Sequence, residues 1–161
     1  MDIHEVLIKL QKNEISIEEA ELYLRRQPFE ELGYAKLDTH RKLRSGFPEV
    51  IFCMGKADGH LLEIVGKLYE AEGEVMGTRA SRAQYELLRA RYPELTYDEV
   101  SGIIKIEKPE KEHIGCITVC TAGTADIAVA EEAAQTAEYF GSHVERVYDV
   151  GVSGLHRLLS R

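Results

Sequence analysis

The residues with the clearest chemical potential form a short turn at positions 121–126, with the sequence TAGTAD, between a β-prone run and a stretch with helical spacing. Small residues such as Gly123 and Ala125 let the backbone approach a ligand closely, and the free N–H groups at a helix start attract anions. Thr124 adds a hydroxyl group, and Asp126 is a candidate acid near the ligand. The turn predicts an anion site; the alternative is a plain strand-to-helix turn in which the aspartate caps the helix.

Basic side chains gather in a second segment, residues 38–49, with the sequence DTHRKLRSGFPE. His40, Arg41 and Arg44 stand before an apolar run that predicts a buried strand, and Lys56 follows this run. Ligands of parallel α/β folds bind at the carboxyl ends of strands, and basic groups there suit phosphate or carboxylate. The alternative for this cluster is an ordinary charged surface.

Three more basic positions follow predicted strands. Arg79 comes after the strand predicted at residues 74–78, while His156 and Arg157 come after the strand predicted at residues 144–150 and a turn with two glycines. This arrangement also suits a phosphate-bearing ligand. The alternative for the last pair is a tight turn and a solvated helix start.

The three cysteines, Cys53, Cys116 and Cys120, are an odd and sparse set. A disulfide framework is therefore not expected, and the default compartment is a reducing cytoplasm. Cys116 and Cys120 alternate on one face of a predicted strand, which predicts inert thiols inside a sheet. Because no CxxC or HxxxH spacing occurs, we predict no metal-ligating residues.

The composition restricts the class of protein. The chain has 161 residues with 44% apolar content, which is enough to bury a core. Twenty basic residues against 28 acidic ones give a net charge of −8, which argues against a general nucleic-acid coat. No segment has the pattern of a targeting signal or the roughly 18–20 apolar residues of a membrane span.

The elements that must position these residues are predicted from periodicity. Apolar residues between positions 3 and 10 indicate a first helix, and a capping box at Ser16 and Glu19 opens a second helix, reaching about Arg26. Between residues 48 and 106 the pattern is strand, helix, strand, helix, strand, which is typical of a layered α/β domain.

A polar, proline-containing segment at residues 107–113 predicts a domain boundary, so the domains are residues 1–113 and 114–161. The second part is predicted as βαβα, the start of a doubly wound parallel sheet. In its helix, Val129, Ala133, Ala137 and Phe140 align as the predicted core face. Because two parallel strands cannot bury both faces alone, we expect this domain to be incomplete.

Five segments taken in order resemble a known family. They are residues 38–50 (DTHRKLRSGFPEV), 55–56 (GK), 121–126 (TAGTAD), 129–133 (VAEEA) and 148–158 (YDVGVSGLHRL). The sequence resembles the LarB family of nickel-pincer cofactor biosynthesis proteins, also labelled circadian phase modifiers and related to the purine enzyme PurE. The resemblance covers residues 38–161.

The resemblance implies an amino-terminal domain followed by a PurE-like, flavodoxin-like parallel sheet. It implies a cytoplasmic carboxylase and hydrolase that acts on nicotinic acid adenine dinucleotide. Carbon dioxide or bicarbonate is the co-substrate, AMP is released, and pyridinium-3,5-biscarboxylic acid mononucleotide, a precursor of the lactate racemase cofactor, is the product. It also implies a homo-octamer. From charge and hydropathy we expect no nucleic-acid or membrane partner; no covalently bound cofactor is expected, and whether Mg²⁺ assists hydrolysis is left open.

The resemblance carries over residue by residue. Gly123, Thr124, Ala125 and Asp126 match the family's nucleotide-binding turn, although Ala125 stands where such turns usually have serine. The other substrate-binding candidates carried by motif position or charge are Lys56, Arg79, His156, Arg157, His40, Arg41 and Arg44. The family's nucleophilic cysteine lies later in the PurE-like domain, so neither Cys116 nor Cys120 matches it.

Two other functions compete with this one. An aminoimidazole ribonucleotide carboxylase or mutase would share the PurE-like part, but the purine enzymes lack the long amino-terminal domain. A non-catalytic dinucleotide-binding or assembly module would explain an incomplete catalytic domain. Preference for nicotinic acid adenine dinucleotide over aminoimidazole ribonucleotide would distinguish the LarB-type enzyme from the purine enzyme. An assay of bicarbonate incorporation would distinguish an enzyme from the non-catalytic module.

Overall fold

The chain consists of two compact units, residues 1–49 and 50–161. A computed structural model describes residues 3–24, 30–38, 41–108, 111–151 and 155–160. We describe each unit by itself. This division does not test the predicted boundary at residue 113, which stays a prediction.

The described residues of the first unit form three helices and a short hairpin. The helices are α1 (Ile3–Gln11), α2 (Ile17–Leu24) and α3 (Arg41–Ser45), and the antiparallel strands are β1 (Glu30–Glu31) and β2 (Lys36–Leu37). The predicted capping box of α2 is confirmed: the Ser16 N–H donates to Glu19 Oε2 at 2.8 Å, and the Glu19 N–H donates to Ser16 Oγ at 3.1 Å. The expected end of α2 near Arg26 lies outside the described residues.

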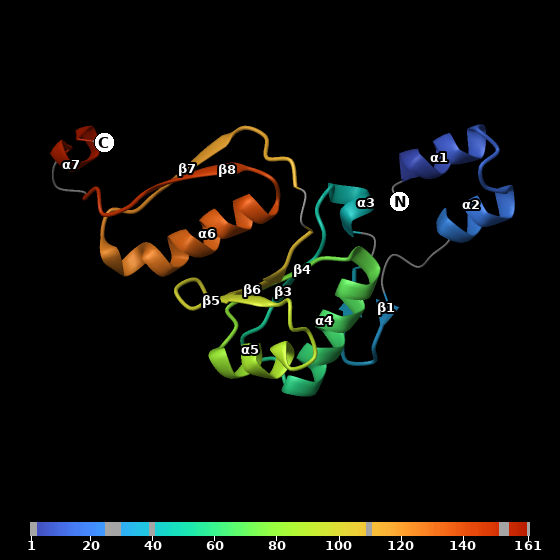
Figure 1. Cartoon of the computed structure of the whole chain (residues 1–161), viewed down its shortest axis with the longest axis horizontal. Helices are drawn as coiled ribbons and strands as arrows, with labels where there is room; N and C mark the ends of the chain where they lie inside the picture. Colours follow the sequence, from blue (N-terminus) through green and yellow to red (C-terminus); the bar gives the residue numbers. More distant parts are fainter. Residues whose placement is uncertain (1–2, 25–29, 39–40, 109–110, 152–154, 161) are drawn as a thin grey trace. The chain divides into compact units, whose positions relative to one another are not determined.

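The second unit begins with a mixed four-stranded sheet in the order β3-β4-β6-β5 (Figure 1). Its strands are β3 (Val50–Phe52), β4 (Val75–Thr78), β5 (Thr96–Asp98) and β6 (Ile103–Ile106). Strand β3 is parallel to β4, as expected of a β–helix–β crossover, and the other pairs are antiparallel. The sequence did not predict β5, which is short, polar and at the edge of the sheet.

The two helices of this part are α4 (Asp58–Glu72) and α5 (Arg82–Arg89), and both have the predicted end signals. Gly73 ends α4 in the left-handed conformation, with φ +68° and its N–H bonded to the Tyr69 carbonyl at 2.8 Å. Ser81 and Gln84 form the capping box that begins α5.

The central strands β4 and β6 are largely buried on both faces, because α4 and α5 lie on one side of the sheet and helix α6 (Ile127–Tyr139) lies on the other (Figure 1). Met76 and Ile103 pack against Tyr139 of α6. The next residue of β4, Gly77, points to the opposite face, where a Cβ atom would lie 2.6 Å from Cys53 Sγ. Glycine at this position therefore lets the sulfur pack directly against the strand.

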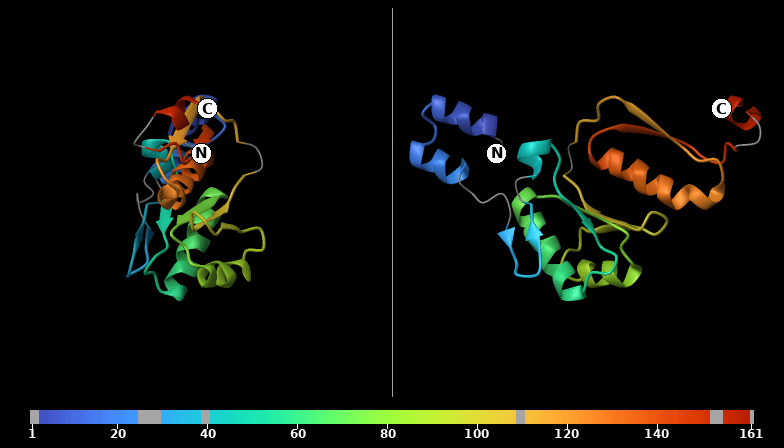
Figure 2. Two further views of the ribbon diagram at one scale, coloured as in Figure 1. Left: turned by 90° about the vertical axis from the view of Figure 1, so that its left-hand side faces the viewer. Right: turned by 180° about the vertical axis from the view of Figure 1, so that it is seen from behind.

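The rest of the second unit is a parallel pair of strands with helix α6 between them in sequence (Figure 2). Strands β7 (Cys116–Cys120) and β8 (His143–Val147) are followed by helix α7 (His156–Leu159), and a short 3₁₀ helix, η1 (Thr124–Asp126), precedes α6. The α/β fold class and the βαβα order are confirmed. That this sheet is incomplete stays a prediction.

Two details of this part were predicted wrongly. Cys116 and Cys120 are exposed, because α6 covers only one face of the two-stranded sheet and the cysteines lie on the other. In α6 the buried residues are Ala130, Ala134 and Tyr139, whereas Val129 is 56% exposed. The predicted core face was therefore displaced by about one residue at Val129 and Ala133, whereas Phe140, also predicted, packs at the margin of the core.

Candidate functional site

The carboxyl ends of β7 and β8 are joined by hydrogen bonds centred on Thr121, which is 4% exposed. The Thr121 N–H donates to the Val147 carbonyl at 3.1 Å, and the Val150 N–H donates to the Thr121 carbonyl at 3.0 Å. The Thr121 hydroxyl oxygen accepts from the Asp149 N–H at 3.1 Å. The loops that follow the two strands therefore form one continuous edge, where parallel sheets bind ligands.

The predicted turn lies at this edge. Gly123 has extended backbone (φ −138°, ψ 173°), and a Cβ atom there would meet nothing within 4 Å. Thr124, Ala125 and Asp126 are exposed. The Asp126 side chain makes no capping hydrogen bond at the start of α6, which removes the main support for its interpretation as a helix cap. The turn thus presents its backbone and the Asp126 carboxylate to solvent.

Arg157 of α7 reaches the same edge. Its guanidinium Nη1 donates to Asp149 Oδ1 at 3.0 Å and to the Asp149 carbonyl at 3.2 Å, and the guanidinium lies against Gly151. The Gly151 N–H donates to the Ala122 carbonyl at 2.7 Å, so this cation stands beside the candidate turn. His156, the neighbouring candidate, is exposed on α7.

A second pair of strand ends carries Lys56 and Arg79. The Gln84 side-chain amide donates to the carbonyl oxygens of Cys53 at 3.0 Å and Lys56 at 3.5 Å, which holds the loop after β3. Arg79 follows β4 with φ +54° and forms an ion pair with Glu132 of α6. The structure therefore links Arg79, but not Lys56, to the helix that begins at the candidate turn.

The remaining basic candidates belong to the first unit. Arg41 is exposed at the first position of α3, where the Ser45 hydroxyl donates to its carbonyl at 2.9 Å. His40 and the side chain of Arg44 lie outside the described residues. The role of all three in binding stays a prediction.

Sequence reasoning missed a charged cluster between β8 and α6. Arg146 donates to Glu131 Oε1 at 3.0 Å and to Glu138 through two bonds of 2.5 and 2.9 Å, and the Tyr148 hydroxyl donates to Glu131 at 2.9 Å. The hydrogen bonds from Arg146 lower the pKa of the Glu138 carboxyl. The signal was present: Glu131 and Glu138 are seven residues apart on one helix face, and Tyr148, just beyond the end of β8, lies two residues after Arg146.

The cysteines differ in their chemistry. Cys53 is fully buried, and desolvation raises the pKa of its thiol to about 12 even though Lys56 opposes the shift. Such a thiol is not a nucleophile at neutral pH. Within the described residues, no group of three or more His, Cys, Asp or Glu side chains is arranged to hold a metal ion.

Other surface features lie apart from these strand ends. A shallow groove of about 190 Å³ runs along α4, and its lining, which includes Gly59, Gly66 and Arg91, contains none of the predicted site residues. In the described part of the chain, no helix is both long and apolar enough to cross a membrane.

Comparison with known proteins places this architecture in a family. Residues 29–108 match the LarB/PurE-like N-terminal domain, which supports assigning the chain to a LarB/PurE-related family. The chain is also 32% identical over 165 residues to a Methanocaldococcus jannaschii protein named "Uncharacterized protein MJ0165". The match covers 98% of this chain and 64% of that relative. The predicted resemblance is therefore confirmed at the level of the family.

Proposed function

We propose that this protein takes part in nickel-pincer cofactor biosynthesis by carboxylating the pyridinium ring of nicotinic acid adenine dinucleotide and hydrolysing its phosphoanhydride. The match of residues 29–108 to the LarB/PurE-like N-terminal domain supports the class of reaction. The observation that carries the site is the continuous edge made by the ends of β7 and β8. There the solvent-facing turn at residues 123–126 stands beside the Arg157 cation.

The substrate is a dinucleotide with two phosphates, so it needs anion-binding backbone and a positive charge. In the proposed complex, the N–H groups of residues 123–126 receive a phosphate, and Thr124 adds a hydroxyl donor. Arg157 approaches the same phosphate while Asp149 keeps its guanidinium in place. Asp126 stays available as an acid or base beside the ligand because it is not used as a cap.

The carboxylation needs a nucleophile, because a cationic pyridinium ring does not attack carbon dioxide. A thiolate that adds to the ring removes its charge, and the resulting enamine-like carbon forms a C–C bond to carbon dioxide. Loss of the ring proton to a base and departure of the thiolate then restore the pyridinium. Burial makes Cys53 unsuitable for this step, and the family resemblance assigns it to neither Cys116 nor Cys120.

Hydrolysis completes the proposed reaction. Water attacks the phosphoanhydride, AMP leaves, and the biscarboxylated mononucleotide remains. Within the described residues no group of three or more His, Cys, Asp or Glu side chains could hold a metal ion, and the proposal assigns Mg²⁺ no step. Cytoplasmic location and assembly as an octamer belong to the same proposal.

Isothermal titration of a version extended to full length tests the ligand class. We expect binding of nicotinic acid adenine dinucleotide and no binding of aminoimidazole ribonucleotide. Gly123→Val is a sharp site variant, because the extended backbone accepts any residue and the side chain enters open space. It should retain the wild-type melting temperature and lose binding. Preference for the purine ligand, or a Gly123→Val variant that binds like wild type, would contradict the proposal.

Asp126→Asn separates a chemical role from a structural one. Since the Asp126 carboxylate makes no capping bond, we expect the variant to have the melting temperature of the wild type. In an assay of the full-length form, it should lose bicarbonate incorporation. A large drop in melting temperature would instead favour a helix cap.

A further inference from the structure

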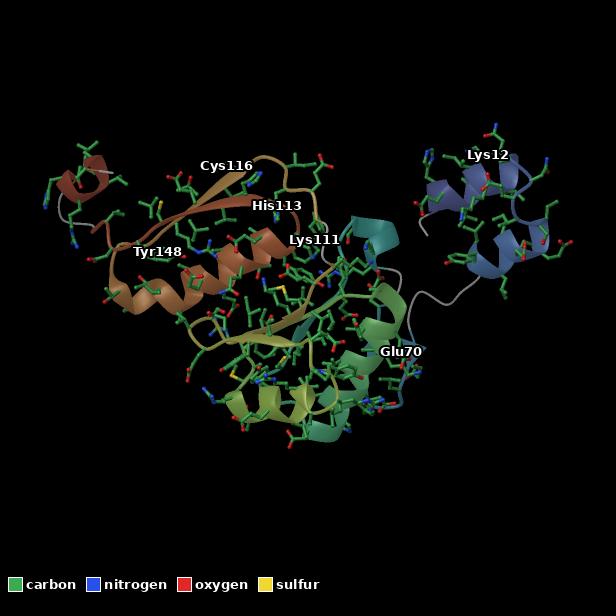
Figure 3. The ribbon with its side chains drawn as sticks, in the orientation of Figure 1. Lys12, Glu70, Lys111, His113, Cys116 and Tyr148 are labelled. Atoms are coloured by element: carbon green, nitrogen blue, oxygen red, sulfur yellow. The ribbon has the colours of Figure 1, made fainter. Side chains whose placement is uncertain are left out.

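Helix α6 is shared between two sheets of the second unit. On one face, Glu131 and Glu138 bind Arg146 of β8. On another, the helix contacts the mixed sheet, and Figure 3 shows Lys111 in the segment that connects the two parts. The helix therefore couples the mixed sheet to the strand pair that carries the candidate turn.

The apolar part of this contact is centred on Tyr139. Its side chain is 1% exposed and packs against Met76 and Ile103, which are both fully buried, with Val50 and Phe140 at the margin. The cluster joins the carboxyl-terminal end of α6 to the centre of the mixed sheet. It supplies attraction, but apolar packing alone is non-directional.

Lys111 adds direction to the same contact. Its ammonium donates to the Tyr139 carbonyl at 2.8 Å, lies 2.7 Å from Glu74 Oε2, and stands 3.6 Å from the centre of the Tyr139 ring. The Lys111 side chain is 19% exposed and that of Glu74 is 6% exposed. The last carbonyls of a helix lack partners within the helix, and a cation is favourable there. One ammonium thus binds the end of α6 and the residue that precedes β4.

A second polar contact lies nearer the start of α6. The Arg79 guanidinium pairs with Glu132, so the helix is bound to the mixed sheet at two points along its length. The 13-residue helix is roughly 20 Å long and behaves as a stiff rod on this scale. Fixing one end and one intermediate point therefore fixes the other end, where the turn at residues 123–126 begins.

We propose that Lys111 is a positioning residue that clamps α6 to the mixed sheet and thereby sets the place of the candidate turn. In this role the mixed sheet is a platform for the binding edge. The inference concerns the protein's own architecture and holds whichever anion the turn binds.

Hydrogen exchange of the ligand-free chain tests the clamp with three single variants. Lys111→Met removes the ammonium but keeps a long side chain, Lys111→Arg keeps a cation, and Lys108→Met removes an exposed lysine of the same segment as a matched control. We expect about tenfold faster exchange in α6 and residues 123–127 for Lys111→Met, with α4 unchanged. Lys111→Arg should restore most of the protection, and Lys108→Met should match wild type.

A double variant keeps the test decisive if Lys111→Met alone does not fold, since that change removes the ammonium that lies 2.7 Å from the buried Glu74 carboxylate. Lys111→Met with Glu74→Gln removes both charges, and α6 should still exchange faster than α4. The proposal would be overturned if α6 kept wild-type protection from exchange in Lys111→Met or in the double variant. It would also be overturned if α4 and α6 lost protection equally, or if Lys108→Met accelerated exchange as much as Lys111→Met. Failure to bind nicotinic acid adenine dinucleotide would overturn the proposed function only.

Discussion

Gly77→Ala is the substitution whose cost follows most directly from the geometry of the sheet. Gly77 lies inside β4, paired with Ile51 of β3 and Ile104 of β6. An added Cβ atom would lie 2.6 Å from Cys53 Sγ and 2.9 Å from Ile104 Cγ1. Both distances are well inside van der Waals contact, so the neighbours must move.

The neighbours have little room to move. Cys53 is 0% exposed and Ile104 is 1% exposed, and the backbone of β4 is held by strands on both sides. Overpacking of a well-packed core typically costs about 1–3 kcal/mol. With about 2–4 °C lost per kcal/mol in a chain of this size, the melting temperature should fall by roughly 2–12 °C.

Differential scanning calorimetry and urea titration measure this cost. Gly59→Ala is the matched control, because Gly59 lies in α4 with nothing within 4 Å of its added Cβ, and alanine favours the helix. Cys53→Ala should recover part of the loss when combined with Gly77→Ala, since it removes the closest atom. A Gly77→Ala protein as stable as wild type, or one unaffected by Cys53→Ala, would refute the packing argument.

Two further predictions concern thiols and pH. A thiol reagent should label Cys116 and Cys120 in the folded chain and Cys53 only on unfolding, because burial raises the pKa of Cys53 to about 12; rapid labelling of all three would contradict the described core. Arg146 lowers the pKa of Glu138. The ion pair between the two therefore stabilises the fold fully above the ordinary glutamate pKa of about 4.3, and this stabilisation is lost as the pH falls through the lowered pKa. The gap in urea midpoint between wild type and Glu138→Gln should therefore be full at neutral pH and close in acid, and a gap independent of pH would argue against the ion pair.

Local signals in the sequence predicted local structure well. The capping boxes at Ser16 and Ser81 and the left-handed end of α4 at Gly73 depend on residues within one helical turn, and all are present. The turn at residues 121–126 is likewise placed at the end of a strand and the start of a helix. Its binding role stays a prediction.

Features that depend on distant partners escaped prediction. The burial of Cys116 and Cys120 depends on what covers the second face of a strand pair, which alternation along one strand does not encode. The burial of Tyr139 near the end of α6 depends on Met76 and Ile103 of the mixed sheet, which lie 63 and 36 residues away in sequence (139 − 76 and 139 − 103). Lys111 stands in a polar, charged segment, and nothing local distinguishes it from its exposed neighbours.

The side chain of Gln84 has a consequence for the chemistry allowed at this position. Its Oε1 atom accepts from the Ser81 N–H at 3.0 Å, while its Nε2 atom donates to the Cys53 carbonyl at 3.0 Å. Glutamate would complete the same helix start, yet it has no N–H to donate and would place a negative charge against a carbonyl oxygen. The Gln84 amide therefore joins the start of α5 to the loop after β3. Glutamine rather than glutamate at this position indicates that a backbone carbonyl of another loop lies within hydrogen-bond distance.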